Sequence, residues 1–402
     1  MTDKPGGAAA AAKPAVMPFS VISAAVTASF VGFGSSVAII LEAGRAVGAS
    51  EAEASTWVGA LCVGIVVISL VLCVRHRVPA VAAWSTPGAA LIASSADGIG
   101  LPVAVGAFIV AAVLMVLLAL IRPFGRLMER LPTSLASAML AGVLVDFCLK
   151  VVGVAGAMPA FVLPLVAVFF AVHFWKPTLA VPAVLLGGLA AAGLGGMIAT
   201  NCCTFAPTAV VVTAPEFDLP VMIGLGVPLF LVTLAAQNLT GLAVLKASGY
   251  VPPARSTFAV TGLSSLLLAP FGAHGVNLAA ITLAICAGPG CHPDPSRRWL
   301  SGIVVAVCYV GLALFAGSFV ELLLALPAAL ITTIAGLALF APLKAALVTA
   351  LTTETGHVEA AALTFVVAAS GVNFLGVGSA IWGLAVGLVI LGAQRIVSGK
   401  SD

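Results

Sequence analysis

Unbroken apolar runs of about 20 residues recur along the whole chain, separated by charged residues or by clusters of Pro and Gly. A helix of about that length crosses the hydrocarbon core of a bilayer. A membrane β-barrel is excluded, because its strands alternate apolar and polar residues. Only 8% of the residues are charged, against about 25% in soluble domains, which excludes soluble enzymes, nucleic-acid binders and disordered proteins. We therefore expect an all-α polytopic membrane protein.

The positions of the charges and of the Pro/Gly clusters divide the runs into about fourteen predicted spans. Their approximate limits are 19–41, 56–74, 79–96, 102–121, 133–150, 159–175, 178–199, 220–243, 257–270, 272–290, 300–317, 321–341, 358–373 and 376–396. With the N-terminus inside, only Arg45 and Lys150 of the 17 basic residues fall outside. Basic loops stay in the cytoplasm, so the count predicts that both termini are cytoplasmic.

The remaining segments carry no sign of a cofactor. Residues 1–18 are rich in Ala, Gly and Pro and lack an apolar stretch before a cleavage site, which predicts a flexible tail and not a signal peptide. Most of the 8 cysteines lie within apolar runs and form no CxxC pair. The neighbouring Cys202 and Cys203 have no further ligands at metal spacing, so we expect no metal and no cofactor.

The two halves of the chain resemble each other at three places. LPTSLASAMLAG at 131–142 matches LPAALITTIAG at 326–336 with one gap, RAVG at 45–48 matches KASG at 246–249, and Pro79 matches Pro270. The offset of about 195–200 residues equals seven predicted spans, and an odd number inverts the second copy. Inverted repeats build secondary transporters with a substrate site between broken helices. The alternative is chance similarity among helices rich in Ala, Leu and Gly.

Spans 3 and 10 each combine an extended, Pro- or Gly-containing part with a helical part. In span 3, Thr86 is a predicted N-cap with Pro87 at the first helical position. In span 10, Asn277 is the predicted N-cap. Two half-helix N-termini facing each other would hold an anion without Lys or Arg. The alternative is a pair of ordinary kinked helices.

Polar side chains interrupt two other spans. Gln237 and Asn238 lie within span 8, and Ser35 and Ser36 lie at the corresponding depth of span 1. Polar groups in the membrane usually face the interior of the bundle, which predicts contact with substrate. Hydrogen bonding between helices is the alternative.

Few ionisable groups fall within the spans. Glu42 and Glu321 lie near predicted outer ends, and Asp146 has the spacing of a helical ion pair with Lys150. His274 lies in the extended part of span 10 and belongs to the residue type that titrates near physiological pH. We rank His274 first as a proton-coupling residue, ahead of Asp146 and Glu42, although a lone His is more often a structural hydrogen-bonding residue.

Four long motifs resemble the benzoate:proton symporter (BenE) family of bacterial inner membranes. They are WSTPGAA at 84–90, AQNLTGLAVLKASGY at 236–250, APFGAHGVNLAAI at 269–281 and CHPDPSRR at 291–298. The resemblance runs from Ser20 to about Arg395. It implies an inner-membrane location and an architecture similar to nucleobase permeases and sulfate transporters, with a seven-plus-seven inverted repeat.

The resemblance also implies two domains and a site between them. The core domain would comprise 19–121 and 220–317, and the gate domain 122–199 and 318–396. Substrate would bind between spans 3 and 10, beside spans 1 and 8. The implied binding residues are Ser35, Ser36, Trp84, Ser85, Thr86, Gln237, Asn238, His274, Gly275 and Asn277.

The leading hypothesis is import of benzoate or a similar aromatic carboxylate with protons, with Phe33, Trp84 and Phe271 as candidate walls for the ring. The alternative is a carrier of another small anion or of a nucleobase. Nucleobase permeases use an acidic residue in span 8, where this chain has Gln237. An intramembrane enzyme would need a cluster such as HExxH, which does not occur. A passive channel would not drive uphill uptake. Expected partners are the substrate, protons, the bilayer and, by architectural analogy, a second copy, but no nucleic acid.

Overall fold

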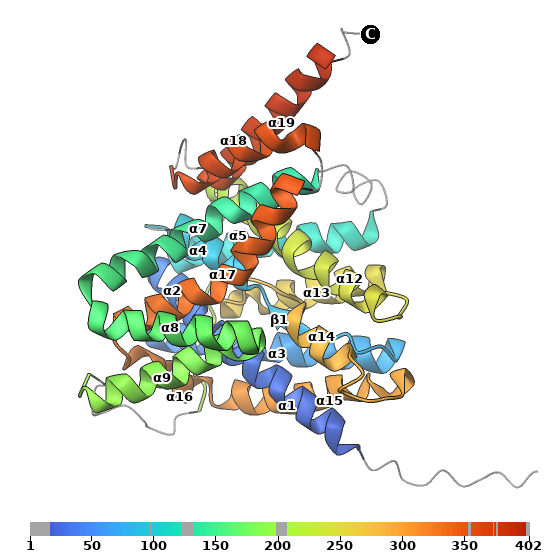
Figure 1. The fold of residues 1–402 in the computed structure, drawn as a ribbon. Helices are drawn as coiled ribbons and strands as arrows, with labels where there is room; N and C mark the ends of the chain where they lie inside the picture. The colour runs from blue at the N-terminus through green and yellow to red at the C-terminus, as the bar shows by residue number, and fades with distance from the viewer. Residues whose placement is uncertain are drawn as a thin grey trace, which may run out of the picture.

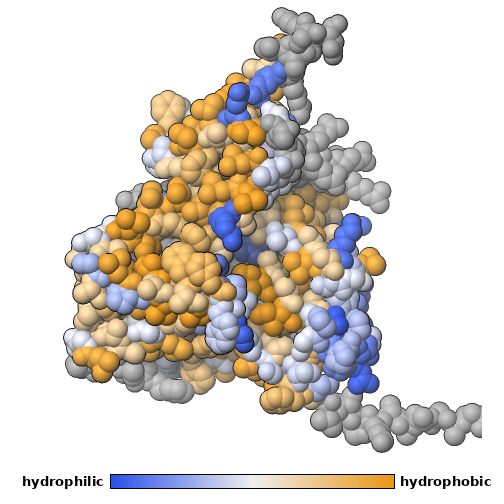
Figure 2. All heavy atoms as spheres, viewed as in Figure 1, coloured by the Kyte–Doolittle hydropathy of each residue, from blue (hydrophilic) through white to orange (hydrophobic). Residues whose placement is uncertain are grey.

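The computed structural model describes residues 17–96, 98–121, 132–197, 207–352, 355–372, 374 and 377–398. The predicted tail up to residue 16, residues 122–131 at the start of the predicted gate domain, and Cys202 and Cys203 lie outside the described residues. Helices make up most of the described chain, and the two short strands β1 and β2 form a ribbon in the middle of the bundle (Figure 1). Hydrophobic residues cover much of the visible surface (Figure 2).

Within the described residues, 8 helical segments are long and apolar enough to cross a membrane. They are Phe19–Ala46, Glu51–His76, Leu101–Leu120, Thr133–Ala157, Pro177–Leu194, Leu219–Ala247, Pro295–Leu314 and Ala328–Thr352. Shorter apolar helices lie at Pro159–Trp175, Val358–Ala369 and Ser379–Gln394. The protein is therefore a mostly helical, multi-pass membrane protein, as predicted.

The elements follow one another along the chain with short connections. The first half contains α1 (Phe19–Gly34), α2 (Val37–Ala46), α3 (Glu51–His76), β1 (Ala82–Trp84), α4 (Thr86–Ser95), α5 (Leu101–Leu120), α7 (Thr133–Ala157), α8 (Pro159–Trp175), η1 (Pro177–Leu179) and α9 (Ala180–Leu194). The second half contains α10 (Leu219–Val221), η2 (Met222–Gly226), α11 (Val227–Thr233), η3 (Leu234–Leu239), α12 (Thr240–Ala247), α13 (Ala254–Leu268), η4 (Ala269–Phe271), β2 (Val276–Leu278), α14 (Ile281–Ala287), η5 (Pro295–Arg297), α15 (Leu300–Leu314), α16 (Ala316–Leu324), α17 (Ala328–Thr352), η6 (Thr355–His357), α18 (Val358–Ala369) and α19 (Ser379–Ser398).

Two predicted spans differ from the observed helices. Span 1 is two helices, because α1 ends at Gly34 and α2 begins at Val37. Span 12, predicted at 321–341, is replaced by α16 and a longer α17 that begins at Ala328. Pro327 explains the second difference, since proline disfavours helical backbone in the residue before it and so separates the two helices.

The helices pack in two groups. In one group α7 packs on α17 and α18, while α8 packs on α9; in the other, α3 packs on α15 and α13, and α5 packs on α13. α7 and α17 are both 25 residues long and begin directly after Pro132 and Pro327 of the matching motifs. Gly336 of α17 lies so close to α7 that an added Cβ would clash with the carbonyl oxygen of Phe147. Small residues thus allow close helix contact.

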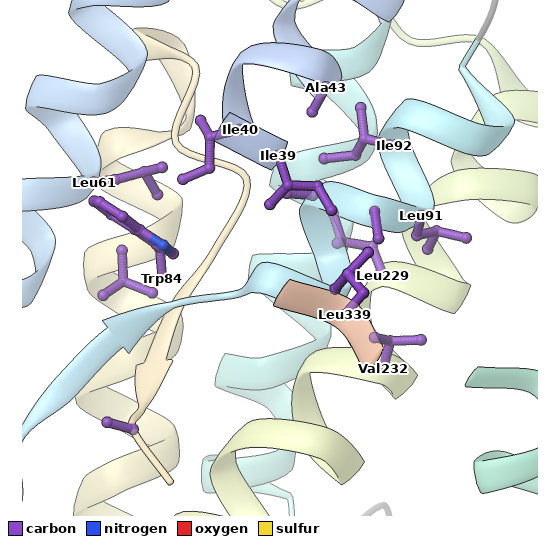
Figure 3. Close-up of a cluster of buried hydrophobic side chains, with 14 of the residues drawn as sticks. Ile39, Ile40, Ala43, Leu61, Trp84, Leu91, Ile92, Leu229, Val232 and Leu339 are labelled. Atoms are coloured by element: carbon purple, nitrogen blue, oxygen red, sulfur yellow. The ribbon is translucent and has the colours of Figure 1, made fainter. Parts of the chain in front are cut away.

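A buried apolar cluster holds α4 in place (Figure 3). Leu91 and Ile92 of α4 lie beside Ile39 of α2, Leu229 of α11 and Leu339 of α17 (Figure 3). All five side chains are fully buried. The helix that follows β1 is therefore fixed by apolar packing on several sides, which positions its first turn at the ribbon.

Candidate substrate site

The ribbon joins the extended parts of predicted spans 3 and 10. β1 and β2 are antiparallel, with Ala83 opposite Asn277. The pairing continues beyond both strands, since Ser85 N–H donates to the Gly275 carbonyl at 3.1 Å and Ala279 N–H donates to the Val81 carbonyl at 3.0 Å. Extended backbone is tolerated inside a membrane protein only where such partners satisfy it. The α4 and α14 helices follow the two strands.

Both predicted N-caps are wrong in detail. The N-cap of α4 is Ser85, whose Oγ accepts a hydrogen bond from Gly88 N–H at 3.0 Å, while Thr86 is the first helical residue. Asn277 is not a cap, because it lies within β2 and α14 begins only at Ile281. Pairing with β1 keeps Asn277 extended, so the helix starts later than local sequence suggests.

His274 is 2% exposed and ties the ribbon to α3. Its Nδ1 accepts a hydrogen bond from Trp57 Nε1–H at 3.0 Å, and its Nε2 lies 2.9 Å from the Ser85 carbonyl oxygen. An indole N–H only donates and a carbonyl only accepts. These partners assign a neutral ring with its proton on Nε2. A second proton on Nδ1 would break the hydrogen bond to Trp57.

Asn238 of η3 and Asn277 of the ribbon form a buried amide pair. Asn238 Oδ1 accepts from Leu278 N–H at 3.0 Å, and its Nδ2 donates to Asn277 Oδ1 at 3.0 Å. Asn238 is 0% exposed and Asn277 is 2% exposed. Asn277 Nδ2 has no hydrogen-bond partner among the described residues. Such an unpaired buried donor is uncommon in native structures and indicates strain, an unseen water or a ligand.

Trp84 ties the ribbon to the break between α1 and α2. Its Nε1–H donates to Ser36 Oγ at 2.7 Å, and Ser36 in turn donates to the Gly32 carbonyl at 2.7 Å. The Trp84 ring lies 5.5 Å from the Phe33 ring and 6.2 Å from the Tyr309 ring, measured between centroids.

The third predicted wall residue, Phe271, lies in η4, next to Gly272. An added Cβ on Gly272 would lie 3.0 Å from Trp57. The η4 turn that holds Phe271 packs against α3 and α5.

Gln237 differs from its buried neighbour Asn238. It lies in η3, a π-helical turn, and is half-buried with no polar partner within the described residues. π-Helical turns inside helices are frequent at functional sites. Ser35 and Thr86 are also half-buried. The predicted set thus divides into three polar side chains that keep accessible surface and seven buried residues: Ser36, Trp84, Ser85, Asn238, His274, Gly275 and Asn277.

The acidic candidates for proton coupling are engaged in surface ion pairs. Asp146 lies 2.8 Å from the ammonium of Lys150, as its helical spacing predicts, and Glu42 lies 2.9 Å from Arg45. Among the described residues, no group of three potential metal ligands comes together. Sequence reasoning missed Trp57, because a tryptophan in an apolar run carries no sign of its hydrogen bond to His274.

Comparison with known proteins supplies the family context. The model of the family described as "Benzoate membrane transport protein" (BenE) matches residues 15–393. The chain is similar to the inner membrane protein YdcO of Escherichia coli (strain K12), with 37% identity over 385 residues, 96% of this chain and 98% of YdcO. It is also similar to the benzoate membrane transport protein of Acinetobacter baylyi, with 31% identity over 362 residues, 90% of this chain and 92% of that protein.

The chain is also similar in fold to solved structures, among them one transporter domain. It is the transmembrane domain of a cyanobacterium bicarbonate transporter, BicA, which aligns with a TM-score of 0.57 over 92% of this chain and 97% of that chain. The sequence identity is 15%, so the likeness concerns the fold alone.

Proposed function

Because the chain belongs to the BenE family of benzoate membrane transport proteins, we propose that it imports benzoate or a similar aromatic carboxylate together with protons. The observation that carries this proposal is the β1–β2 ribbon in the middle of the bundle. Half-buried Thr86 follows the ribbon directly, and η3, which holds Gln237, packs against β2. Accessible polar groups beside buried extended backbone are typical of transporter substrate sites.

The proposed architecture is an inverted repeat of seven plus seven spans, with both termini on the cytoplasmic side of the inner membrane. The matching starts of α7 and α17 and the pairing of β1 with β2 support the repeat. The first packing group would be the gate domain and the second the core domain. Because α16 packs on α3, we propose that the second gate segment begins with α17 rather than at residue 318.

The carboxylate of the substrate would bind at the first turn of α4. Helix N-termini carry partial positive charge and favour anions, and Thr86 adds a hydroxyl there. The amide of Gln237 would supply a further donor. Phe33 and Trp84 would form an apolar wall for the ring, which fits their contact at the α1–α2 break.

Proton coupling would offset the charge of the substrate. A benzoate anion that enters a negative-inside cell is opposed by about 2.3 kcal/mol per 100 mV. His274 is the leading proton carrier because it lies against Ser85 at the start of α4. Uptake of a proton at Nδ1 would break the hydrogen bond that the imidazole accepts from Trp57. Protonation and a rearrangement at the ribbon would therefore occur together. Asp146, Glu42 and the neutral acid form of the substrate are the alternatives.

The test is uptake of labelled benzoate into proteoliposomes under an imposed inward proton gradient. Accumulation above equilibrium that a protonophore abolishes is the expected result, and it would also exclude a passive channel. Unlabelled nucleobases and bicarbonate serve as competitors for the alternative substrates. Absence of benzoate binding to the purified, folded protein would contradict the proposal.

A further inference from the structure

One side of α3 carries a row of exposed valines. Val63, Val67, Val71 and Val74 follow one another at intervals of four, four and three residues, so they share one face of the helix, and each is 40–47% exposed. The row is about 16 Å long, roughly half of the hydrocarbon core of about 30 Å. It therefore matches the acyl region of one leaflet.

α15 extends this apolar surface. It packs along α3, since a Cβ added to Gly302 would clash with the Cys73 side chain and one added to Gly59 would lie 3.6 Å from the Ala313 carbonyl oxygen. α15 lies at the lower edge of the bundle in Figure 1 and exposes three apolar side chains of its own. The α3–α15 face comprises Val63, Val67, Val71, Val74, Val307, Val310 and Leu314.

Arg77 stands at one end of this face. It is the C-cap of α3 and, within the described residues, the one non-glycine residue with a positive φ, 55°. Its guanidinium carbon lies 4.0 Å from the centroid of the Trp299 ring, and Trp299 directly precedes α15. Stacking occupies the flat face of a guanidinium and leaves the N–H groups at its edge available. Among the described residues these N–H groups have no acidic or hydrogen-bonding partner.

The surroundings of Arg77 are positively charged. The described helix ends and loops at this end of α3 carry six basic residues and one acidic residue: Arg75, Arg77, Lys246, Arg255, Arg297, Arg298 and Asp294. Figure 2 shows hydrophilic residues gathered at its right-hand edge, over the end of α12 and the loop after α14. Asp294 is already bound by Ser296, so a second copy of the chain brings little counter-charge to this end. The charge favours an anionic ligand instead.

We propose that the α3–α15 face binds a phospholipid with an anionic headgroup. The phosphate accepts hydrogen bonds from the fixed guanidinium of Arg77, an arrangement for which this side chain is well suited. The acyl chain lies along the valines. The lipid braces α3 against α15 beside Trp299. This site is separate from the proposed substrate site and does not depend on which substrate is carried.

Binding of two lipids with the same chains to the purified full-length protein tests the proposal. In native mass spectrometry, dioleoylphosphatidylglycerol is expected to bind several-fold more tightly than dioleoylphosphatidylcholine. Arg77→Gln should lower the affinity for phosphatidylglycerol about fivefold. Arg297→Gln is the matched control, because it removes the same charge from an exposed side chain that is already paired with Asp294. It should bind phosphatidylglycerol as the wild type does.

A second variant covers the case in which Arg77→Gln does not fold. Trp299→Leu keeps the charge of Arg77 but removes the ring that fixes it, and should also weaken phosphatidylglycerol binding. Equal binding of the two lipids, or equal losses in Arg77→Gln and Arg297→Gln, would overturn the inference, because the charge of this end would then act without a site. Displacement of the lipid by glycerol 3-phosphate at equal concentration would show that the apolar face contributes nothing. A dimer that Val307→Trp dissociates, with lipid binding unchanged, would make the face an interface between copies.

Discussion

Both the hydrogen bond from Trp57 and the burial of the ring oppose the charged form of His274 that proton coupling would need. Trp57 donates to Nδ1, and Ser85 occupies the other nitrogen. A buried polar group with both partners satisfied is stable, and removal of one partner costs about 1–3 kcal/mol. The residue therefore acts as a rigid link between α3 and the ribbon in the described state.

His274→Gln separates a titrating role from a structural one. Gln can accept from Trp57 and donate to Ser85, so we expect benzoate binding and counterflow to persist while uptake no longer responds to the proton gradient. Trp57→Phe is the companion variant. In Trp57→Phe, proton-coupled uptake should persist to higher pH, because protonation of His274 no longer breaks the hydrogen bond from Trp57. Uphill uptake by His274→Gln in a pH gradient would make His274 structural.

Ser85 and Thr86 are neighbours with different predicted roles. Ser85→Ala removes the cap of α4 and should lower the free energy of unfolding by about 0.5–2 kcal/mol, which a thermal shift in detergent would detect. Thr86→Ala removes a half-buried hydroxyl that makes no cap, so stability should change little while benzoate binding weakens several-fold. Equal effects of the two variants on both measurements would argue against a carboxylate at this turn.

At the scale of elements, α14 depends on the loop that follows it. Arg298 is 7% exposed and donates to the carbonyl of Ala287 at 2.7 Å and to that of His292 at 2.7 Å. Ala287 is the last residue of α14, and a cation at a helix C-terminus interacts favourably with the negative end of the helix dipole. Nearby, two hydrogen bonds from Ser296 to the Asp294 carboxylate lower the pKa of that group. The loop thus anchors the short helix by its C-terminal end.

Arg298→Gln should destabilise the protein by about 1–3 kcal/mol, since it leaves buried carbonyls without a charged donor. The neighbouring Arg297 offers a matched control. Its side chain is 56% exposed and lies 3.8 Å from Asp294, and exposed pairs of this kind contribute about 0–1 kcal/mol. Thermal shift assays of both variants check the contrast. Similar melting temperatures for the two would show that Arg298 does not hold α14.

At the scale of the whole molecule, the two packing groups suggest movement of one body against the other. α1 packs on α15 of the second group, whereas α9 belongs to the first. Gly34 of α1 and Leu185 of α9 meet across this border, with 3.8 Å between an added Cβ on Gly34 and Leu185 Cδ2. A cross-link between Gly34→Cys and Leu185→Cys, in a chain without other cysteines, should abolish uptake and leave part of the benzoate binding intact.

A second cysteine pair serves as the control for that cross-link. Gly188 of α9 and Leu330 of α17 are in contact within one packing group. Cross-linking Gly188→Cys to Leu330→Cys should preserve uptake, because no movement is expected between these helices. Full uptake after cross-linking of the first pair would refute the two-body picture.

The membrane class and the family follow from sequence because they depend on local features. Apolar runs of bilayer length determine spans wherever they occur, and the motifs 84–90 and 269–281 contain enough specific residues to indicate the family. The same holds for the change from extended to helical backbone in spans 3 and 10, which Pro and Gly determine within a few residues. The pair of Asp146 and Lys150 was also predictable, since both residues lie on one helix.

Tertiary structure alone decided which polar groups are buried and what they bind. The local sequence predicts Asn277 as a helix N-cap. Its pairing with Ala83 and its hydrogen bond with Asn238 instead keep it in a strand. The neutral tautomer of His274 depends on Trp57, 217 residues away. Such long-range partners leave no local pattern, because a hydrogen bond between distant segments forms only when the packing of the other helices brings them together.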